Sequence, residues 1–230
     1  MTLKHTIRLI TIDLDDTLWP CMPTIMQAEQ ASYDWLQQRV PKITEHYSME
    51  QLRDRRRDLM QRQPELRNDM SEARRAHFRE LADEFDYPHD WVEEGFQVFL
   101  TARQRVELYD DSLPVLQQLA SRYTLVALTN GNADIQRTGL GEVFHGQLSA
   151  ADVQAAKPDP AMFLAAMERI GVNPDQTLHV GDHPVHDICG ARLAGIRSVW
   201  VNRLGAVWSV DDYHADYEVS DLNELLQLLL

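Results

Sequence analysis

The sequence is poor in cysteine and contains no long apolar run. The two cysteines, Cys21 and Cys189, lie far apart and match neither a metal-binding nor a redox spacing, so we expect ordinary thiols in a reducing compartment, the cytoplasm. No apolar stretch approaches the roughly 20 residues that span a bilayer. The N-terminal apolar stretch is short and ends in aspartates, which is not the pattern of a signal peptide.

Positive charge is also scarce, since 22 lysines and arginines stand against 36 acidic residues and give a net charge of −14 at pH 7. Such a surface repels phosphate backbones and anionic lipids, so neither nucleic acid nor a membrane surface is an expected partner. A small anionic ligand would need a pocket made locally positive by a metal ion or a few cations. Only three of the basic residues are lysines, at positions 4, 42 and 157. Because arginine supplies almost all of the positive charge, the placement of a lysine is informative about function.

Short strand-like and helix-like segments alternate from about residue 108 onward. The expected strands are an apolar run near residues 7–12 and the segments 124–128, 177–180, 198–201 and 217–219. The expected helices between and after them are 134–138, 160–170, 185–194 and 222–229. This alternation predicts an α/β fold with a doubly wound, Rossmann-like parallel sheet.

One connection in this pattern is far too long for a simple strand–helix–strand unit, which needs about 30 residues. Residues 24–105 are helical in pattern and strongly charged, and they are punctuated at Pro64 and at Tyr87-Pro88. Arginines at 53 and 55–57 are interleaved with aspartates, and we expect them to form a solvated helix face. Residues 1–20 and 106–230 are therefore predicted to form the core, and residues 21–105 an inserted α-helical cap.

Asp13 and Asp15 follow the first predicted strand, at the sheet edge where parallel sheets bind ligands. Their spacing lets both side chains converge on one point, with Asp16 turned away. Beside a divalent cation, one carboxylate can act as an ionised nucleophile while the other, held protonated, supplies a proton to a leaving oxygen. Taken alone, the pair is more typical of a turn or a helix cap than of a catalytic site.

Polar residues also follow the strand at 124–128. Thr129 offers a hydroxyl, Asn130 an amide, and Gly131 a backbone N–H, which together could cradle an anion. An ordinary Asn-Gly turn explains the same residues equally well. Lys157 stands before Pro158-Asp159-Pro160, and its compact charge suits a phosphate oxygen or a carboxylate, although chance placement remains an alternative.

A third acidic group follows the strand at 177–180. Asp182 ends that strand, and Asp187 lies on the helical turn after it. Asp13, Asp182 and a backbone carbonyl are the oxygen ligands that Mg²⁺ prefers, and Asp187 could hold the ion directly or through water. His183 and His186 would suit zinc, but the oxygen-rich surroundings favour a flanking role for both.

Together these segments resemble the haloacid dehalogenase-like hydrolase superfamily. Its four motifs occur in order at residues 13–17, at 128–130, at 157–158, and at 181–182 followed by Asp187. The resemblance covers nearly the whole chain, including a helical cap inserted after the first motif. It implies that Asp13 is a nucleophile that forms an aspartyl-phosphate, and that Asp15 is first the general acid and then the base for water.

The resemblance also implies the ligands of phosphate and metal. Thr129 and Lys157 would hold the phosphoryl oxygens, with Asn130 at the edge of that site. The Mg²⁺ ligands would be Asp13, the carbonyl of Asp15 and Asp182, with Asp187 in support. The expected activity is therefore a Mg²⁺-dependent phosphatase acting on a small-molecule phosphate monoester, as a monomer or a homodimer.

Several alternatives stay open. The founding dehalogenases of this superfamily do not keep an aspartate at the place of Asp15, which favours phosphate esters over 2-haloacids. Phosphonate-cleaving members use a cap lysine, and Lys42 is the only lysine in the expected cap, so that chemistry is disfavoured. A phospho-receiver module or an inactive scaffold are non-enzymatic alternatives, against which the cap and the intact motifs argue.

A finer resemblance concerns residues 18–20 and 63–69, which look like bacterial flavin mononucleotide phosphatases. Those enzymes also act on a phosphorylated ribitylaminouracil, a riboflavin precursor. Trp19 and Arg67 are the corresponding candidate substrate contacts, with ordinary packing or surface exposure as the alternative.

Overall fold

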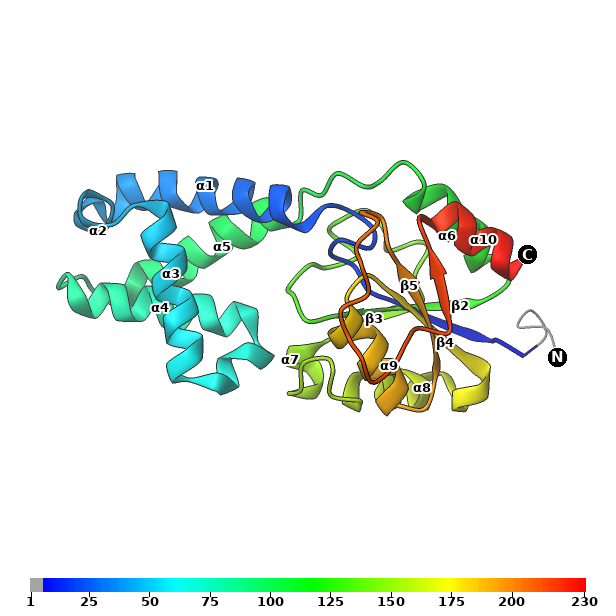
Figure 1. Cartoon of the computed structure of the whole chain (residues 1–230). Coiled ribbons are helices and arrows are strands. Elements are labelled where there is room, and N and C mark those ends of the chain that lie inside the picture. Colours follow the sequence, from blue (N-terminus) through cyan, green and yellow to red (C-terminus); the bar gives the residue numbers. More distant parts are fainter. Residues whose placement is uncertain (1–5) are drawn as a thin grey trace. The chain divides into compact units, whose positions relative to one another are not determined.

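The structure, a computed structural model, describes residues 6–230, so residues 1–5 of the expected core lie outside the described residues. The chain divides into two compact units (Figure 1). The sheet unit comprises the chain up to Pro20 together with Glu107–Leu230, and the helical unit comprises Cys21–Val106. The helical unit is thus an insertion between the first and second strands of the sheet.

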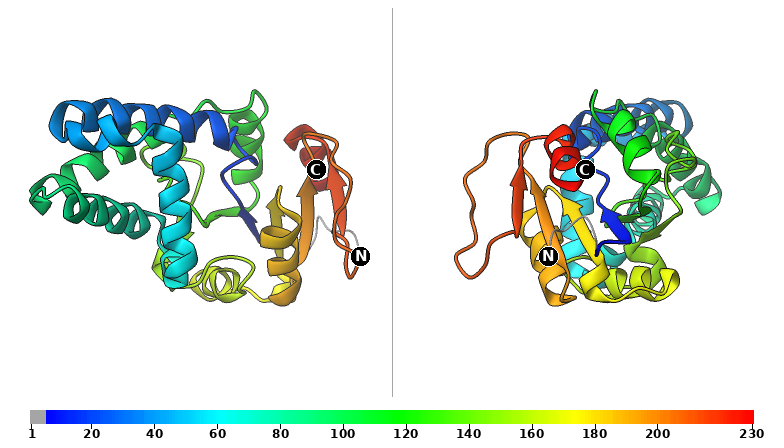
Figure 2. Two further views of the ribbon diagram at one scale, coloured as in Figure 1. Left: turned by 60° about the vertical axis from the view of Figure 1, so that its left-hand side comes forward. Right: turned by 90° about the vertical axis from the view of Figure 1, so that its right-hand side faces the viewer.

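The sheet unit is built on six parallel strands in the order β3-β2-β1-β4-β5-β6. The strands are β1 (Leu9–Ile12), β2 (Thr124–Thr129), β3 (Gly146–Ser149), β4 (Thr177–Gly181), β5 (Arg197–Val201) and β6 (Tyr217–Val219). The right-hand view of Figure 2 shows β5 and β6 to one side of β1. Strand order reverses at β1, so its carboxyl end, between those of β2 and β4, is the expected ligand site. The predicted doubly wound parallel sheet is confirmed.

Helices cover both faces of this sheet (Figure 1). The α-helices are α6 (Ser112–Ala120), α7 (Ala150–Val153), α8 (Ala161–Ile170), α9 (Gly190–Leu193) and α10 (Leu222–Leu229). A 3₁₀ helix, η4 (Pro174–Gln176), precedes β4, and a π-helix, η5 (Pro184–Cys189), follows it. Helices α8 and α9 lie on one face, and α6 and α10 lie on the other.

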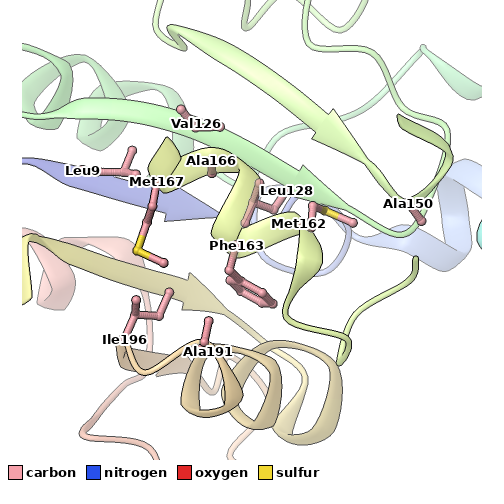
Figure 3. Packing of buried hydrophobic residues seen from close by; sticks show 11 residues of the cluster. Leu9, Val126, Leu128, Ala150, Met162, Phe163, Ala166, Met167, Ala191 and Ile196 are labelled. Atoms are coloured by element: carbon pink, nitrogen blue, oxygen red, sulfur yellow. The ribbon is translucent and has the colours of Figure 1, made fainter. Parts of the chain in front are cut away.

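A single apolar cluster fixes α8 against the sheet. Figure 3 shows Phe163 of α8 lying between the strands and Ala191 of α9, with Val126 of β2 in the same cluster. Phe163 is fully buried. A Cβ on Gly190 would lie 2.7 Å from the Phe163 ring, so the absence of a side chain there lets α9 approach α8. This packing makes β1, β2 and β4 a rigid base for the residues at their ends.

The helical unit contains α-helices joined by short turns. They are α1 (Cys21–Arg39), α2 (Pro41–His46), α3 (Met49–Arg62), α4 (Met70–Glu84) and α5 (Val92–Arg103), with 3₁₀ helices η2 (Pro64–Asn68) and η3 (His89–Trp91). The predicted breaks at Pro64 and Tyr87-Pro88 are confirmed. No helix within residues 6–230 combines the length and the apolarity needed to cross a bilayer.

The arginines of α3 do not form the uniformly solvated face that we expected. Arg57 is exposed and pairs with Asp54 at 3.0 Å, but Arg56 reaches the buried carboxylate of Glu29 on α1 at 2.5 Å. Arg74 of α4 also pairs with Glu29, at 2.8 Å. The prediction was wrong for Arg56 because a buried acid on another helix turns its guanidinium inward.

Two further elements differ from the prediction. Residues 135–139 form turns rather than the helix expected at 134–138, and β3 was not predicted. The side chain of Asp134 accepts the N–H of Gln136 at 2.9 Å, which stabilises a turn in place of a helix. Gln147 of β3 ties the same segment to the sheet, because its side chain bonds the N–H of Ile135 at 2.9 Å and the carbonyl of Ala133 at 2.6 Å.

Candidate active site

A cavity of about 160 Å³ lies in the sheet unit at the carboxyl ends of β1, β2 and β4. Its lining residues are Asp13, Asp15, Asp16, Thr129, Asn130, Gly131, Lys157, Asp182, His183, His186 and Asp187. The structure therefore brings all the predicted catalytic, phosphate-binding and metal-binding residues to one place. Asp16 also lines the cavity, contrary to our expectation, because its backbone adopts the left-handed conformation with φ of 60°, which aspartate tolerates.

The loop after β1 is a tight, hydrogen-bonded turn. The Asp13 N–H donates to the Val180 carbonyl at 2.9 Å, which continues the β1–β4 pairing by one residue. The Asp16 N–H then bonds the Trp19 carbonyl at 2.8 Å, closing the turn. The indole N–H of Trp19 donates to the Asp15 carboxylate at 2.9 Å. Hydrogen bonds thus hold the backbone of Asp13 and the side chain of Asp15 in place.

Lys157 joins the predicted nucleophile to the rest of the site. Its Nζ lies 2.6 Å from Asp13 Oδ1, 2.7 Å from Asp187 Oδ1 and 2.9 Å from the Leu128 carbonyl, so three ammonium protons meet three acceptors. The ammonium is buried. Burial opposes its charge, but the carboxylates of Asp13 and Asp187 outweigh that effect and raise the pKa of Lys157 above its usual range. Lys157 is therefore a permanent cation inside the cavity.

Asn130 holds the backbone of Lys157 in place. Its side-chain amide donates to the Lys157 carbonyl at 3.0 Å, and its oxygen accepts the Lys157 N–H at 2.7 Å. The Thr129 hydroxyl accepts the N–H of Gly131 at 2.9 Å, so that N–H faces Thr129 in this structure instead of forming an open cradle. The Thr129 hydroxyl hydrogen can still donate toward a bound anion.

Three carboxylates form a cluster that can hold a metal ion. One oxygen each of Asp13, Asp182 and Asp187 lies within 4.8 Å of the others. The buried hydroxyl of Thr17 lies 3.4 Å from Asp13 Oδ2 and 3.3 Å from Asp182 Oδ1. The cluster is tied to two different strands, so the geometry depends on the sheet rather than on one flexible loop.

The electrostatics of the cluster fit a cation. Burial, together with the charges of Asp187 and Asp16, raises the pKa of Asp182 to about 7. Burial likewise raises the pKa of Asp13, against the opposing effect of Lys157. Burial acts in the same sense on Asp187, but Lys157 and His179 outweigh it and lower the Asp187 pKa. With five carboxylates and one lysine ammonium in its lining, the cavity has the excess of oxygen ligands that a hard divalent ion would neutralise.

The two candidate substrate contacts lie in different units. Trp19 is fully buried and touches Asp15, so the structure places it as a partner of the predicted general acid. Arg67 is exposed on η2 of the helical unit. A direct contact of either residue with substrate stays a prediction.

The structure gives residues around the cavity roles that sequence reasoning did not assign, and Trp200 was not considered at all. A Cβ on Gly181 would lie 2.4 Å from Asp187 Cγ, so only glycine permits this approach of the carboxylate to the end of β4. The indole N–H of Trp200 donates to the Asp182 carbonyl at 2.6 Å. His183 accepts the N–H groups of Val185 and His186 at 3.1 Å and so caps η5, a role that periodicity alone does not reveal.

The fold and this cavity define a hydrolase of a recognisable class. The haloacid dehalogenase-like hydrolase family matches residues 7–195, and the chain belongs to that family. It is 29% identical over 199 residues to the 5-amino-6-(5-phospho-D-ribitylamino)uracil phosphatase YigB of Escherichia coli strain K12, covering 85% of this chain and 83% of that protein.

Two solved structures are similar over almost the whole length. A 2-haloacid dehalogenase from Pseudomonas syringae pv. Tomato DC3000 has 39% sequence identity and a TM-score of 0.90, covering 97% of this chain and 98% of its own. The HAD-hydrolase YfnB from Bacillus subtilis, in a structure bound to magnesium, has 22% identity and a TM-score of 0.68, with 97% and 98% coverage. The second likeness concerns the fold alone.

Proposed function

We propose that this chain is a Mg²⁺-dependent phosphatase that hydrolyses a small-molecule phosphate monoester through an aspartyl-phosphate on Asp13. The observation that carries the proposal is the position of Asp15, which lines the same cavity as Asp13 and is fixed by the Trp19 indole. A carboxyl group at this place can give a proton to an alkoxide leaving group and later take one from water.

In the first step, a carboxylate oxygen of Asp13 attacks phosphorus while Asp15 protonates the departing ester oxygen, which leaves as an alcohol. In the second step, Asp15 takes a proton from water, which attacks phosphorus and releases inorganic phosphate and the Asp13 carboxylate. Thr129 and Lys157 donate hydrogen bonds to the phosphoryl oxygens, and Lys157 does so by giving up one of its three present acceptors. A bound Mg²⁺, held by Asp13, Asp182, Asp187 and the Asp15 carbonyl, would offset the repulsion between carboxylate and phosphate.

Flavin mononucleotide or a phosphorylated ribitylaminouracil is the proposed substrate. The resemblance of residues 18–20 and 63–69 to flavin mononucleotide phosphatases supports this choice, as does the likeness to a relative named for ribitylaminouracil phosphate. The proposed setting is the cytoplasm, with a monomeric or homodimeric enzyme and neither nucleic acid nor membrane as a partner.

A 2-haloacid dehalogenase is the second candidate, favoured by the 39% identity and the TM-score of 0.90 to a structure of that name. The lining of the cavity favours the phosphatase over it. A halide leaves as a stable anion and needs no proton, so Asp15 would have no task.

The experiment compares phosphate and halide release by the purified full chain. An aryl phosphate, flavin mononucleotide, a phosphorylated ribitylaminouracil and 2-chloropropionate are each supplied with Mg²⁺ or with EDTA. We expect catalytic phosphate release with Mg²⁺, and loss of turnover in Asp13→Asn and in Asp15→Asn. Asp175→Asn is the matched control, because Asp175 is exposed on η4, before β4, at the opposite end of that strand from the cavity.

The possible outcomes separate the alternatives. Halide release that needs no metal, without phosphate release, would identify a dehalogenase and overturn the proposal. One equivalent of phosphate transferred without turnover would indicate a phospho-receiver. No reaction with any of these compounds would favour a scaffold.

A further inference from the structure

A buried histidine lies beside the cavity without lining it. His179, in the middle of β4, is paired in register with Thr11 of β1, and its side chain is fully buried. Its Nδ1 lies 2.9 Å from Thr11 Oγ1, and its Nε2 lies 3.2 Å from Asp187 Oδ1. The Phe163 ring packs edge-on against the imidazole, with the two ring centroids 4.8 Å apart. Burying an imidazole among apolar neighbours is costly unless its nitrogens are satisfied, and here both are.

The partners of His179 determine where its proton lies. An ionised carboxylate only accepts hydrogen bonds, so the Nε2 that faces Asp187 carries the hydrogen. Burial lowers the pKa of His179, which favours the neutral ring. The Thr11 hydroxyl lies 2.9 Å from Nδ1 and 3.4 Å from the Leu178 carbonyl. The result is a chain of contacts from Thr11 through His179 to Asp187, in which His179 donates to Asp187.

Asp187 connects His179 to Lys157 through hydrogen bonds to both residues. Its Oδ1 accepts from both His179 and Lys157, and its Oδ2 accepts the His183 N–H at 2.9 Å. The other two N–H groups of the Lys157 ammonium donate to Asp13 and to the Leu128 carbonyl. A shift of the Asp187 carboxylate therefore leaves one ammonium proton unmatched and turns Lys157 away from Asp13.

We propose that His179 is a positioning residue, which together with Thr11 holds Asp187 so that Lys157 points at Asp13. This inference rests on the proposed function for its kinetic consequence, while its structural part stands on the contacts alone. No reaction step passes through His179, and its neutral ring exchanges no proton with the substrate.

Four substitutions of the network separate positioning from simple packing. His179→Gln retains an N–H that can reach Asp187, whereas His179→Asn is too short to do so, and His179→Leu has no donor. Thr11→Val removes the hydroxyl that contacts His179 Nδ1. Ser198→Ala is the matched control, because Ser198 is a buried neighbour of His179 in the β4–β5 pairing whose hydroxyl bonds Asp216 at 3.4 Å and no member of this network.

The kinetic readout is the split between kcat and KM at saturating Mg²⁺. Losing a hydrogen bond behind a metal-site carboxylate reduces activity roughly 10- to 100-fold. We expect a kcat loss of that size in His179→Leu and His179→Asn with KM nearly unchanged, and most of the activity retained in His179→Gln. Thr11→Val should lose less than His179→Leu, and Ser198→Ala should retain full activity.

The second readout does not depend on turnover. The sequence has only three lysines, so a protein labelled with ¹⁵N-lysine gives a simple ammonium spectrum, and burial protects the Lys157 signal from exchange. That signal should persist in His179→Gln and shift or broaden in His179→Asn. If His179→Leu does not fold, the Gln and Asn pair still tests the inference.

Unchanged kcat and an unchanged Lys157 signal in His179→Asn would overturn the inference. Equal losses in Gln and Asn would also overturn it, because they would show that packing rather than the hydrogen bond matters. If the spectrum changes as expected while no variant, nor the natural chain, releases phosphate, then the proposed function fails and the positioning role stands.

Discussion

The affinity of the carboxylate cluster for Mg²⁺ should depend steeply on pH, because Asp182 must lose a proton before it can bind a metal ion. Its pKa is raised to about 7 by burial and by the neighbouring carboxylates. Below that pH the metal-free site is protonated, so an arriving ion has to displace the proton. Above it the carboxylate is already free, and affinity reaches a plateau.

The magnitude follows from this one group. With a pKa of about 7, lowering the pH from about 7.5 to about 5.5 should weaken Mg²⁺ binding about 25-fold, or about 2 kcal/mol. A carboxylate with an ordinary pKa near 4 would change the affinity by only a few per cent over that range. Asp13, whose pKa burial also raises, acts in the same direction. The pH dependence of the Mg²⁺ affinity thus measures how strongly burial and the neighbouring carboxylates raise the pKa of Asp182.

Isothermal titration calorimetry in two buffers of different ionisation enthalpy measures both the affinity and the protons released. We expect about 0.9 proton per ion from Asp182 at about pH 6 and about 0.1 at about pH 8. Asp182→Asn should bind Mg²⁺ more weakly at pH 7.5 and lose the part of the dependence that Asp182 contributes. A dissociation constant that stays constant between these pH values, with no proton release, would refute the reasoning.

Three further predictions concern stability and rate. Trp19→Phe keeps one aromatic ring but removes the N–H that Asp15 accepts, so we expect kcat to fall roughly 10-fold in steady-state assays, with a lower melting temperature because the fully buried site is left with a cavity. Gly181→Ala places a methyl group against Asp187, and urea unfolding should show a loss of about 1–3 kcal/mol. Burial opposes the charge of Glu29, but two arginines outweigh it and lower its pKa to about 2, so its contribution of about 3 kcal/mol is present above pH 4.5 and fades toward pH 2. Glu29→Gln should remove that contribution in urea unfolding at neutral pH, and an unchanged midpoint would contradict the assignment.

The positions of the cavity residues could be predicted because they follow strand signals directly. Asp13, Thr129 and Asp182 each come at the end of an apolar run, and parallel strands bring their carboxyl ends to one edge. Lys157 is a different case, because no strand precedes it. Asn130 holds it there by two hydrogen bonds that no local pattern encodes.

Elements whose stability comes from distant side chains were harder to predict. Strand β3 has four residues, all partly exposed, so its sequence carries no apolar run. Its pairing with β2 and the bonds from Gln147 to residues 133 and 135 define it instead. A local reading of residues 134–138 cannot include Gln147, and it therefore favours a helix where the chain makes turns.

Arg56 shows that a signal can be present in the sequence and still be misread. It lies four residues after Leu52 and three before Leu59, and both leucines are buried, so helical periodicity places Arg56 on the buried face of α3. The many charged residues next to Arg56 in the sequence nevertheless suggested that its side chain is exposed to solvent. A buried cation needs a buried anion, and Glu29 on α1 supplies it. Periodicity should thus be applied to charged residues as strictly as to apolar ones, and a charged side chain on an apolar face should prompt a search for its partner on another helix.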